Sequence, residues 1–222
     1  MGHLYLVRHG QASLGEDNYD QLSERGHAQS LRLGQYWREL GVQFDHVICA
    51  TMQRHHQTLA GIAQGMQQDL PALSWPGLNE YDAEAVIESV HAAPRERPTT
   101  ATAYRQHFQW LRQGLNQWAL GHVQPKGLPT WSEFVHGVTS ALDHAHRSDA
   151  GHVLVVTSGG PISIALGHVM GLSEHARIEL NLQMRNTSIS ELRKAANGYR
   201  VVSFNTLPHL ASPLHQDWIT YA

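Results

Sequence analysis

Three short polar stretches of the sequence could together bind an anion, and each follows an apolar run of strand length. They read RHG at 8–10, ATMQR at 50–54 and TSGG at 157–160. In open α/β sheets, ligands bind in the crevice at the carboxyl ends of the strands. The three stretches are therefore predicted to face one pocket that contains Arg8 and Arg54. Two guanidinium groups and the N–H groups of helix N-termini are well suited to a phosphate group.

A histidine stands in the same predicted pocket. His9 directly follows Arg8, and the positive charge of neighbouring arginines disfavours the cationic form of an imidazole. A histidine that stays neutral near pH 7 is a nucleophile that can accept a phosphoryl group. Ser158 and Gly159 add a hydroxyl and a main-chain N–H group at the start of a predicted helix. Each stretch is common by itself, and their order along the chain is the signal.

The elements that must position these residues alternate between strand and helix. Continuous apolar runs predict strands, and apolar residues at helical spacing predict helices. The predicted strands cover 3–7, 45–50, 152–157, 178–184, 187–193 and 199–204. The predicted helices cover 22–40, 52–66, 131–147 and 161–171. This alternation indicates a three-layer α/β/α fold with a mostly parallel central sheet.

The length of the chain favours one domain. Its 222 residues are 41% hydrophobic, which is enough for one sizeable core. We expect a single domain over residues 1–222. The segment at about 83–130 looks helical but contains the polar break AAPRERPTT, and it is predicted to be a helical insertion or lid.

Composition narrows the classes of partner and location. The formal net charge is −3 without a block of like charge, so we expect neither a nucleic acid nor a membrane as a partner. Cys49 is the one cysteine. It excludes an intrachain disulfide and is predicted to be a small core residue. No apolar run is long enough to span a bilayer and no charged leader is seen, so a cytoplasmic location is expected.

The 17 histidines raise the question of a metal site. They are scattered, and no HExxH pattern is present. His55 and His56 are adjacent and are expected to point to two sides of a helix. No Gly-rich nucleotide motif follows a predicted strand. We therefore expect no metal and no organic cofactor.

The stretch LVRHGQAS at 6–13 resembles the signature of the histidine phosphatase superfamily, the phosphoglycerate mutase-like proteins. Further stretches resemble this family in chain order: YDQLSERGHAQSLRLG, ATMQRHHQTL, LNEYD, VVTSGGPI and RNTSISEL. Among them, ATMQRHHQTL resembles the family's second arginine motif, whose general form is SPxxRAxQT. The matches run from about residue 4 to residue 192.

The resemblance implies roles for the residues of the predicted pocket. His9 would be the nucleophile that becomes phosphohistidine. Arg8 and Arg54 would hold the transferred phosphoryl group. The first motif departs from the RHGExxxN of many relatives, and here Gln11 could add a polar contact. No cofactor takes part in such chemistry, and the implied ligand is a small phosphorylated metabolite or phosphate.

The resemblance also implies a general acid. Glu80, in LNEYD, would protonate the leaving oxygen and then act as the base for water. This role needs a carboxyl whose pKa is raised by burial or by the substrate dianion. Asp82 and Glu84 lie close in sequence and stay open as alternatives.

The position of Ser158 departs from the family pattern, which has a histidine there. A serine can donate one hydrogen bond but cannot carry charge. Loss of one transition-state donor costs roughly 10²–10³ in rate, and the retained hydroxyl should soften that loss. Two interpretations stay open: an enzyme that is slower or tuned to another phosphoester, and a protein that binds phosphorylated ligands with little turnover.

Three functions follow from these observations. The retained nucleophile, arginines and acid favour a phosphomonoester hydrolase that works through phosphohistidine. A phosphoglycerate-type mutase would need further cations, and Arg95 and Arg97 are the obvious candidates. The third is a phosphate-ligand binding or regulatory protein without catalysis. Whether the chain forms a homodimer stays open.

Overall fold

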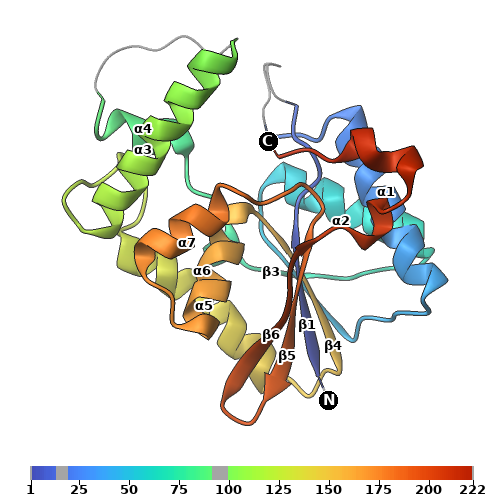
Figure 1. Cartoon of the computed structure of the whole chain (residues 1–222). Coiled ribbons are helices and arrows are strands. Elements are labelled where there is room, and N and C mark those ends of the chain that lie inside the picture. Colours follow the sequence, from blue (N-terminus) through green and yellow to red (C-terminus); the bar gives the residue numbers. More distant parts are fainter. Residues whose placement is uncertain (1, 14–19, 92–99, 222) are drawn as a thin grey trace.

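A six-stranded sheet lies between two layers of helices in the computed structural model, which describes residues 2–13, 20–91 and 100–221 (Figure 1). The order of the strands is β3-β2-β4-β1-β5-β6. Their bounds are β1 (His3–Arg8), β2 (His46–Cys49), β3 (Leu73–Ser74), β4 (His152–Thr157), β5 (Ile189–Ala195) and β6 (Gly198–Thr206). The first four strands are parallel, and β5 and β6 pair antiparallel with their neighbours. The predicted α/β fold with a mostly parallel sheet is confirmed.

The helices divide between the two faces of the sheet. α1 (Glu24–Glu39) and α2 (Gln53–Met66) pack on one face, and α5 (Trp131–Arg147) and α6 (Gly159–Met170) pack on the other (Figure 1). α3 (Ala83–Glu88), α4 (Ala101–Ala119) and α7 (Glu174–Asn181) lie on the α5–α6 side. Three short 3₁₀ helices, at Pro76–Leu78, Pro208–Leu210 and Pro213–Trp218, complete the described chain.

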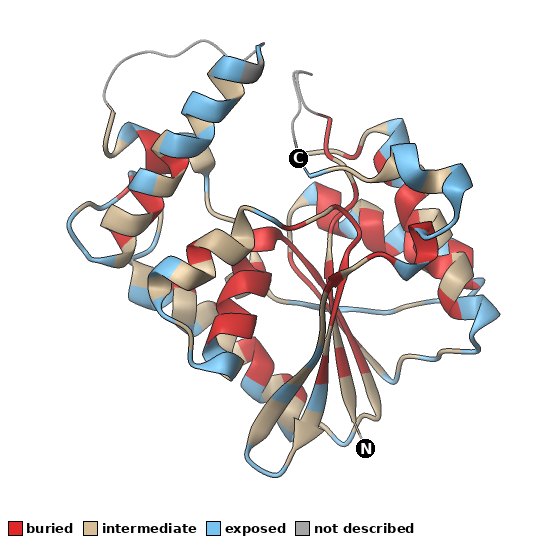
Figure 2. Cartoon of the chain, viewed as in Figure 1, coloured by how far each residue is buried: buried red, intermediate tan, exposed pale blue. Residues whose placement is uncertain are grey.

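Alternation along the strands produces two hydrophobic cores, one on each face of the sheet. Leu6 belongs to the core under α5 and α6, and Val7 belongs to the core under α1 and α2. Cys49 is a free, buried thiol in the second core, as predicted, and burial raises its pKa to about 12. Figure 2 shows buried residues along the central strands and the inner faces of the helices.

Local signals in the sequence explain where α1 begins and ends. The Ser23 side chain accepts a hydrogen bond from the Gly26 N–H and so caps the helix. Gly41 follows the helix with a φ of 67°, a left-handed conformation that glycine adopts without steric cost.

The strand predicted at 178–184 is wrong. These residues form the end of α7 and the turn after it. Ser173 caps this helix by accepting from the Ala176 N–H, and Glu174 lies in the first turn, where a negative charge stabilises a helix. The alternation of apolar and polar residues in IELNL resembles a strand, but one buried residue, Ile178, suffices to anchor a helix of eight residues.

The predicted helical segment at 83–130 contains α3 and α4, which pack against each other. Trp118 at the end of α4 reaches the core: it is 1% exposed and contacts Trp131 and Phe134. Arg95 and Arg97 lie outside the described residues. Whether the segment is an insertion or a lid stays a prediction.

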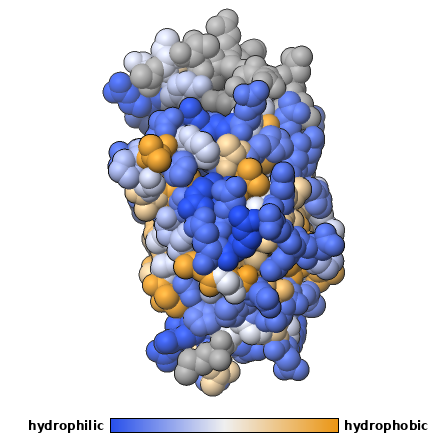
Figure 3. All heavy atoms as spheres, turned by 90° about the vertical axis from the view of Figure 1, so that its right-hand side faces the viewer, coloured by the Kyte–Doolittle hydropathy of each residue, from blue (hydrophilic) through white to orange (hydrophobic). Residues whose placement is uncertain are grey.

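The described helices and one face of the surface show how hydrophobic side chains are distributed. No helix in the described ranges is long and apolar enough to cross a membrane. Figure 3 shows the side of the molecule that carries α1 and the C-terminal segment, where hydrophilic side chains dominate and hydrophobic ones are scattered.

Candidate active site

The ends of β1 and β4 bring the first and third polar stretches together. Arg8 pairs with Thr157 in the parallel register, and the His9 N–H donates to the Thr157 carbonyl at 2.9 Å. The second stretch arrives from the end of β2, which is the other neighbour of β4. The predicted convergence of the three stretches at one edge of the sheet is therefore observed.

His9 is 3% exposed, and its ring has a defined orientation. Nδ1 lies 2.7 Å from the Gly10 carbonyl oxygen. A carbonyl can only accept, so the proton of the neutral ring resides on Nδ1 and the lone pair on Nε2. Burial, followed by the charges of Arg54 and Arg8, holds the pKa of His9 well below its usual value. The ring is therefore a neutral imidazole with a nucleophilic Nε2.

A threonine joins the turn after β1 to α2. The Gly10 N–H donates to Thr58 Oγ1 at 3.0 Å, and this hydroxyl donates to the Arg54 carbonyl at 2.8 Å. Thr58 is fully buried. Its hydroxyl fixes the position of the histidine turn relative to the second arginine.

The two arginines are held in different ways. Arg8 Nη1 donates to the carbonyl oxygens of Met184 and Tyr221, each at 2.5 Å. Arg54, 4% exposed, donates from Nη1 to Asp20 Oδ1 at 2.8 Å. Asp20 Oδ2 also accepts from the Gln53 N–H at the start of α2. A carboxylate at this point shows that Arg54 and the helix N-terminus accept an anion. Sequence reasoning did not select Asp20.

Glu80 lies at the same edge of the sheet. Thr157 Oγ1 donates to the Leu78 carbonyl at 2.5 Å. The Asn79 side chain accepts a hydrogen bond from the Thr51 N–H and donates one to the Thr51 hydroxyl. These contacts fix the loop before Glu80 against the ends of β4 and β2. The Gly160 N–H then donates to Glu80 Oε2 at 3.0 Å.

Electrostatics separate Glu80 from an ordinary surface carboxylate. Burial raises the pKa of its carboxyl above the usual value, although the Gly160 N–H and the charges of Arg54 and Arg8 act in the opposite direction. A Cβ added at Gly160 would overlap this carboxylate, so the close contact depends on glycine. The alternatives lie elsewhere: Asp82 caps α3 by accepting from Glu84 and Ala85 N–H groups, and Glu84 is exposed.

Ser158 follows β4 and is the N-cap residue of α6, but its side chain makes no capping hydrogen bond. Its hydroxyl lies 2.7 Å from Nε2 of His55. His55 is fully buried and His56 is exposed, as expected for two sides of a helix. Sequence reasoning did not select His55, because only folding brings its ring to Ser158.

Gln11 and Gly159 take different positions. The Gly159 backbone belongs to the first turn of α6, beside Gly160. The Gln11 side chain accepts a hydrogen bond from Ser23 Oγ at 3.1 Å. The main-chain N–H of Gln11 donates to the Gln29 side chain. Gln11 lines an open groove together with the start of α1 and the residues just before it.

A strained segment supports the histidine turn from the other side. Thr187 has a φ of 54°, which is rare for a β-branched residue and costs energy. Its N–H is shared between the Arg8 and His9 carbonyls, and the Asn186 side chain also donates to the His9 carbonyl. The hydroxyl of Thr187 contacts Nε2 of buried His209 at 3.0 Å. This supporting segment lies within RNTSISEL, which resembles the family, but the sequence did not indicate its contacts with the histidine turn.

Within the described ranges, no group of three or more histidine, cysteine or acidic side chains is arranged to hold a metal ion. The site is a compact group of a neutral histidine, two arginines and a desolvated carboxyl beside the first turns of two helices. This arrangement can hold a phosphoryl group, offer a nucleophile to it and supply a proton.

Comparison with known proteins identifies the family of the chain. The family model described as "Histidine phosphatase superfamily (branch 1)" matches residues 4–207. The 2,3-bisphosphoglycerate-dependent phosphoglycerate mutase of Bartonella quintana (strain Toulouse) is 34% identical over 86 residues, which are 36% of this chain and 42% of that protein. The mitochondrial serine/threonine-protein phosphatase Pgam5 of Drosophila ananassae is 42% identical over 91 residues, which are 40% of this chain and 27% of that protein.

The matched segments thus span less than half the length of these curated relatives. Among solved structures, a mycobacterial glucosyl-3-phosphoglycerate phosphatase has the same fold, with a TM-score of 0.67 and 16% identity, over 93% of this chain and 100% of that chain. The family model covers nearly the whole chain from β1 to the end of β6. The protein therefore belongs to the histidine phosphatase superfamily.

Proposed function

We propose that the protein is a phosphomonoester hydrolase that works through a phosphohistidine on His9. The observation that carries this proposal is the buried, neutral His9, which keeps its Nε2 lone pair while two arginine charges act on its ring. An imidazole in this state attacks phosphorus, and the arginines compensate the charge of the phosphoryl oxygens.

The first step transfers the phosphoryl group to the enzyme. Nε2 of His9 forms a bond to phosphorus while the bond from phosphorus to the ester oxygen breaks. Protonated Glu80 gives its proton to that leaving oxygen, and the raised pKa of its carboxyl keeps the proton available. Arg8 and Arg54 hold the phosphoryl oxygens during the transfer.

The second step regenerates the enzyme. The Glu80 carboxylate accepts a proton from water, the water oxygen bonds to phosphorus, and the N–P bond to His9 breaks. Inorganic phosphate leaves, His9 is neutral again and Glu80 is again protonated. Protons and electron pairs balance over the two steps without a cofactor.

The relatives support this proposal at the level of chemistry. One is a mutase and two are phosphatases, and both reactions move phosphoryl groups. We favour hydrolysis over a mutase reaction, whose extra cations would have to come from residues such as Arg95 and Arg97. We further propose that Ser158 takes the place of the family's second histidine, that the segment 83–130 selects the substrate, and that the protein is cytoplasmic.

The experiment is phosphate release from an aryl phosphate and a panel of small phosphoesters, from acidic to neutral pH. Wild type is compared with His9→Ala and with His168→Ala, which changes an exposed histidine at the opposite end of α6. We expect turnover by wild type and His168→Ala and none by His9→Ala. Equal turnover by His9→Ala would overturn the proposal.

A second readout separates the non-catalytic alternative. Thermal unfolding is measured with and without inorganic phosphate. If none of the three proteins turns over a phosphoester while phosphate still stabilises wild type, the protein is a phosphate-ligand binding protein on this fold.

A further inference from the structure

The pair formed by His55 and Ser158 is built into the site but has no part in the two steps above. His55 extends from the first turn of α2, and its side chain is 0% exposed. Its Nε2 lies 2.7 Å from the Ser158 hydroxyl, and its ring centroid lies 5.6 Å from that of His9. The pair therefore lies directly beside the proposed nucleophile.

The register of the sheet places the serine and the nucleophile on one face. Arg8 pairs with Thr157, so His9 and Ser158 stand one residue beyond a matched pair of parallel strands. Side chains alternate along each strand, and both residues continue the face of Val7 and Val156, which belongs to the core under α1 and α2. The Ser158 hydroxyl thus emerges on the same side as the His9 ring, and His55 packs over it from α2.

The hydrogen bonds of His55 indicate which way the serine hydroxyl points. Within the described part of the chain, Nδ1 of His55 is buried without a partner. Burial, with the charges of Arg54 and His56, lowers the pKa of His55 well below its usual value, so the ring carries one proton. Buried N–H groups without an acceptor are rarer than buried acceptors without a donor, which favours the proton on Nε2.

With that tautomer, the Nε2–H group of His55 donates to Ser158 Oγ, which accepts this hydrogen bond through one lone pair. The hydroxyl proton must then find another acceptor. The Ser158 side chain does not cap α6, so no main-chain capping contact orders it in another direction. A hydroxyl directed by His55 on the face of His9 is suited to a phosphoryl oxygen bound between His9 and the arginines.

The sequence motifs give an independent reason to treat the two residues as a pair. The motif that ATMQRHHQTL resembles has alanine after its arginine, where this chain has His55. The motif that VVTSGGPI resembles has histidine where this chain has Ser158. Relative to the family motifs, the chain lacks the histidine at position 158 and has an additional one at position 55. In the folded chain the His55 ring contacts Ser158.

We propose that His55 is a positioning residue that orients Ser158 as a hydrogen-bond donor to the phosphoryl group, so that the pair does the work of the missing histidine. This inference rests on the proposed function. It assigns Ser158 a contact with substrate and His55 an action through Ser158.

The test compares His55→Phe, His55→Gln and Ser158→Ala with the control His56→Phe, which changes the exposed neighbour. Loss of one transition-state donor lowers kcat by roughly 10²-fold. We expect that loss in His55→Phe and in Ser158→Ala, with a smaller change in KM. His55→Gln can donate from its amide nitrogen and should recover most of kcat. The double variant, His55→Phe with Ser158→Ala, should lose no more than either single variant.

The outcomes separate this inference from the proposed function. If wild type depends on His9 but His55→Phe keeps full kcat, or if the two losses multiply in the double variant, the inference is wrong and the proposed function stands. If turnover persists in His9→Ala, the proposed function fails. Thermal unfolding of each variant, with and without phosphate, checks that a loss of kcat is not a loss of the fold.

Discussion

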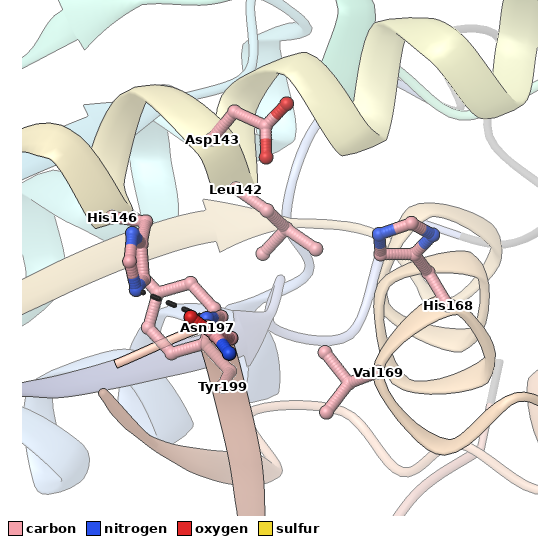
Figure 4. A pocket seen from close by; sticks show the side chains of 8 residues that line it. Leu142, Asp143, His146, His168, Val169, Asn197 and Tyr199 are labelled. Carbon is pink, nitrogen blue, oxygen red and sulfur yellow. Dashed lines mark hydrogen bonds between the residues drawn. The ribbon is translucent and has the colours of Figure 1, made fainter. Parts of the chain in front are cut away.

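Both ends of the sheet hold histidines beside charged groups, but their electrostatic environments are opposite. At the carboxyl ends of the parallel strands, arginine charges and burial lower the pKa of His9. At the other end, a cavity of about 340 Å³ is lined by Asp143, His146, His168 and Tyr199, among others (Figure 4). There, burial and the negative charge of Asp143 raise the pKa of Tyr199.

Chain direction explains the difference. α2 and α6 begin at the first end and present N–H groups that have no acceptor within the helix, whereas α5 and α6 end near the cavity and present carbonyl groups. His146 lies at this end, and its Nε2 is 2.9 Å from the carbonyl oxygen of Ala195, the last residue of β5. A parallel sheet therefore concentrates anion-binding groups at one end, and the number of histidines does not locate the chemistry.

The largest expected effect comes from the acid. Glu80→Gln keeps the shape of the side chain but cannot deliver a proton, and general acid catalysis contributes about 10²–10⁴ in rate. We expect a loss in this range of kcat for alkyl phosphates, and a much smaller loss for an aryl phosphate whose leaving oxygen needs no proton. The control is Asp143→Asn in the cavity, which should leave both rates unchanged. Equal losses of kcat on the two substrate types would remove Glu80 from the role of acid.

The second effect tests the positive charge at the strand ends. Arg54→Ala removes a buried guanidinium beside the nucleophile and should lower kcat/KM by about 10²–10³. It should also weaken the stabilisation of the fold by inorganic phosphate. Arg147→Ala, an exposed arginine in the last turn of α5, is the matched change at the other end. A similar loss in both variants would mean that net charge, and not the site, controls activity.

A third change separates catalysis from stability within one helix. Gly160→Ala places a Cβ against the Glu80 carboxylate and should displace it, whereas Gly167→Ala places one against the flexible Arg177 side chain. A displacement of about 1 Å can cost 10²-fold in rate. We expect kcat to fall by up to this factor in Gly160→Ala alone, with similar melting temperatures for the two variants. An active Gly160→Ala would show that the contact between Gly160 and Glu80 is not needed.

The smallest effect concerns stability and pH. Burial, followed by the charges of Arg32 and His215, lowers the pKa of His209 from 6.5 to about 3. The folded state thus binds this proton less readily than the unfolded state, and the stabilisation present above pH 6.5 is lost as the pH falls towards about 3. One such group contributes a slope of at most about 1.4 kcal/mol per pH unit. Denaturant unfolding of His209→Gln across this range should show a shallower slope than wild type, and an unchanged slope would contradict the assignment.

Much of the fold could be predicted because local signals agree with tertiary packing. β4 is a continuous apolar run at 152–157, and α5 has a capping box between Thr130 and Glu133. α7 was missed because its apolar residues alternate as in a strand, and the Ser173 cap decides the outcome. In a short segment with conflicting signals, the capping residue and the packing contacts determine the secondary structure.

The structure brings together the residues predicted for the centre of the site, whereas the residues that support them were not predicted. His9 directly follows β1 and Arg54 lies in the first turn of α2, after β2, so the topology of a parallel sheet places them together. Glu80 was predicted from the family resemblance. His55 and Thr187 act through contacts across 103 and 22 residues, with Ser158 and His209 respectively. No spacing in the sequence encodes such contacts, and only the folded chain shows them.

The most direct test of the account is to trap the phosphoryl group during turnover. Wild type is mixed with a labelled phosphoester and quenched rapidly, and the labelled peptide is identified. The account predicts an acid-labile label on His9, which is absent in His9→Ala and accumulates less in Ser158→Ala. An acid-stable label on Ser158, or turnover without a labelled His9, would contradict it.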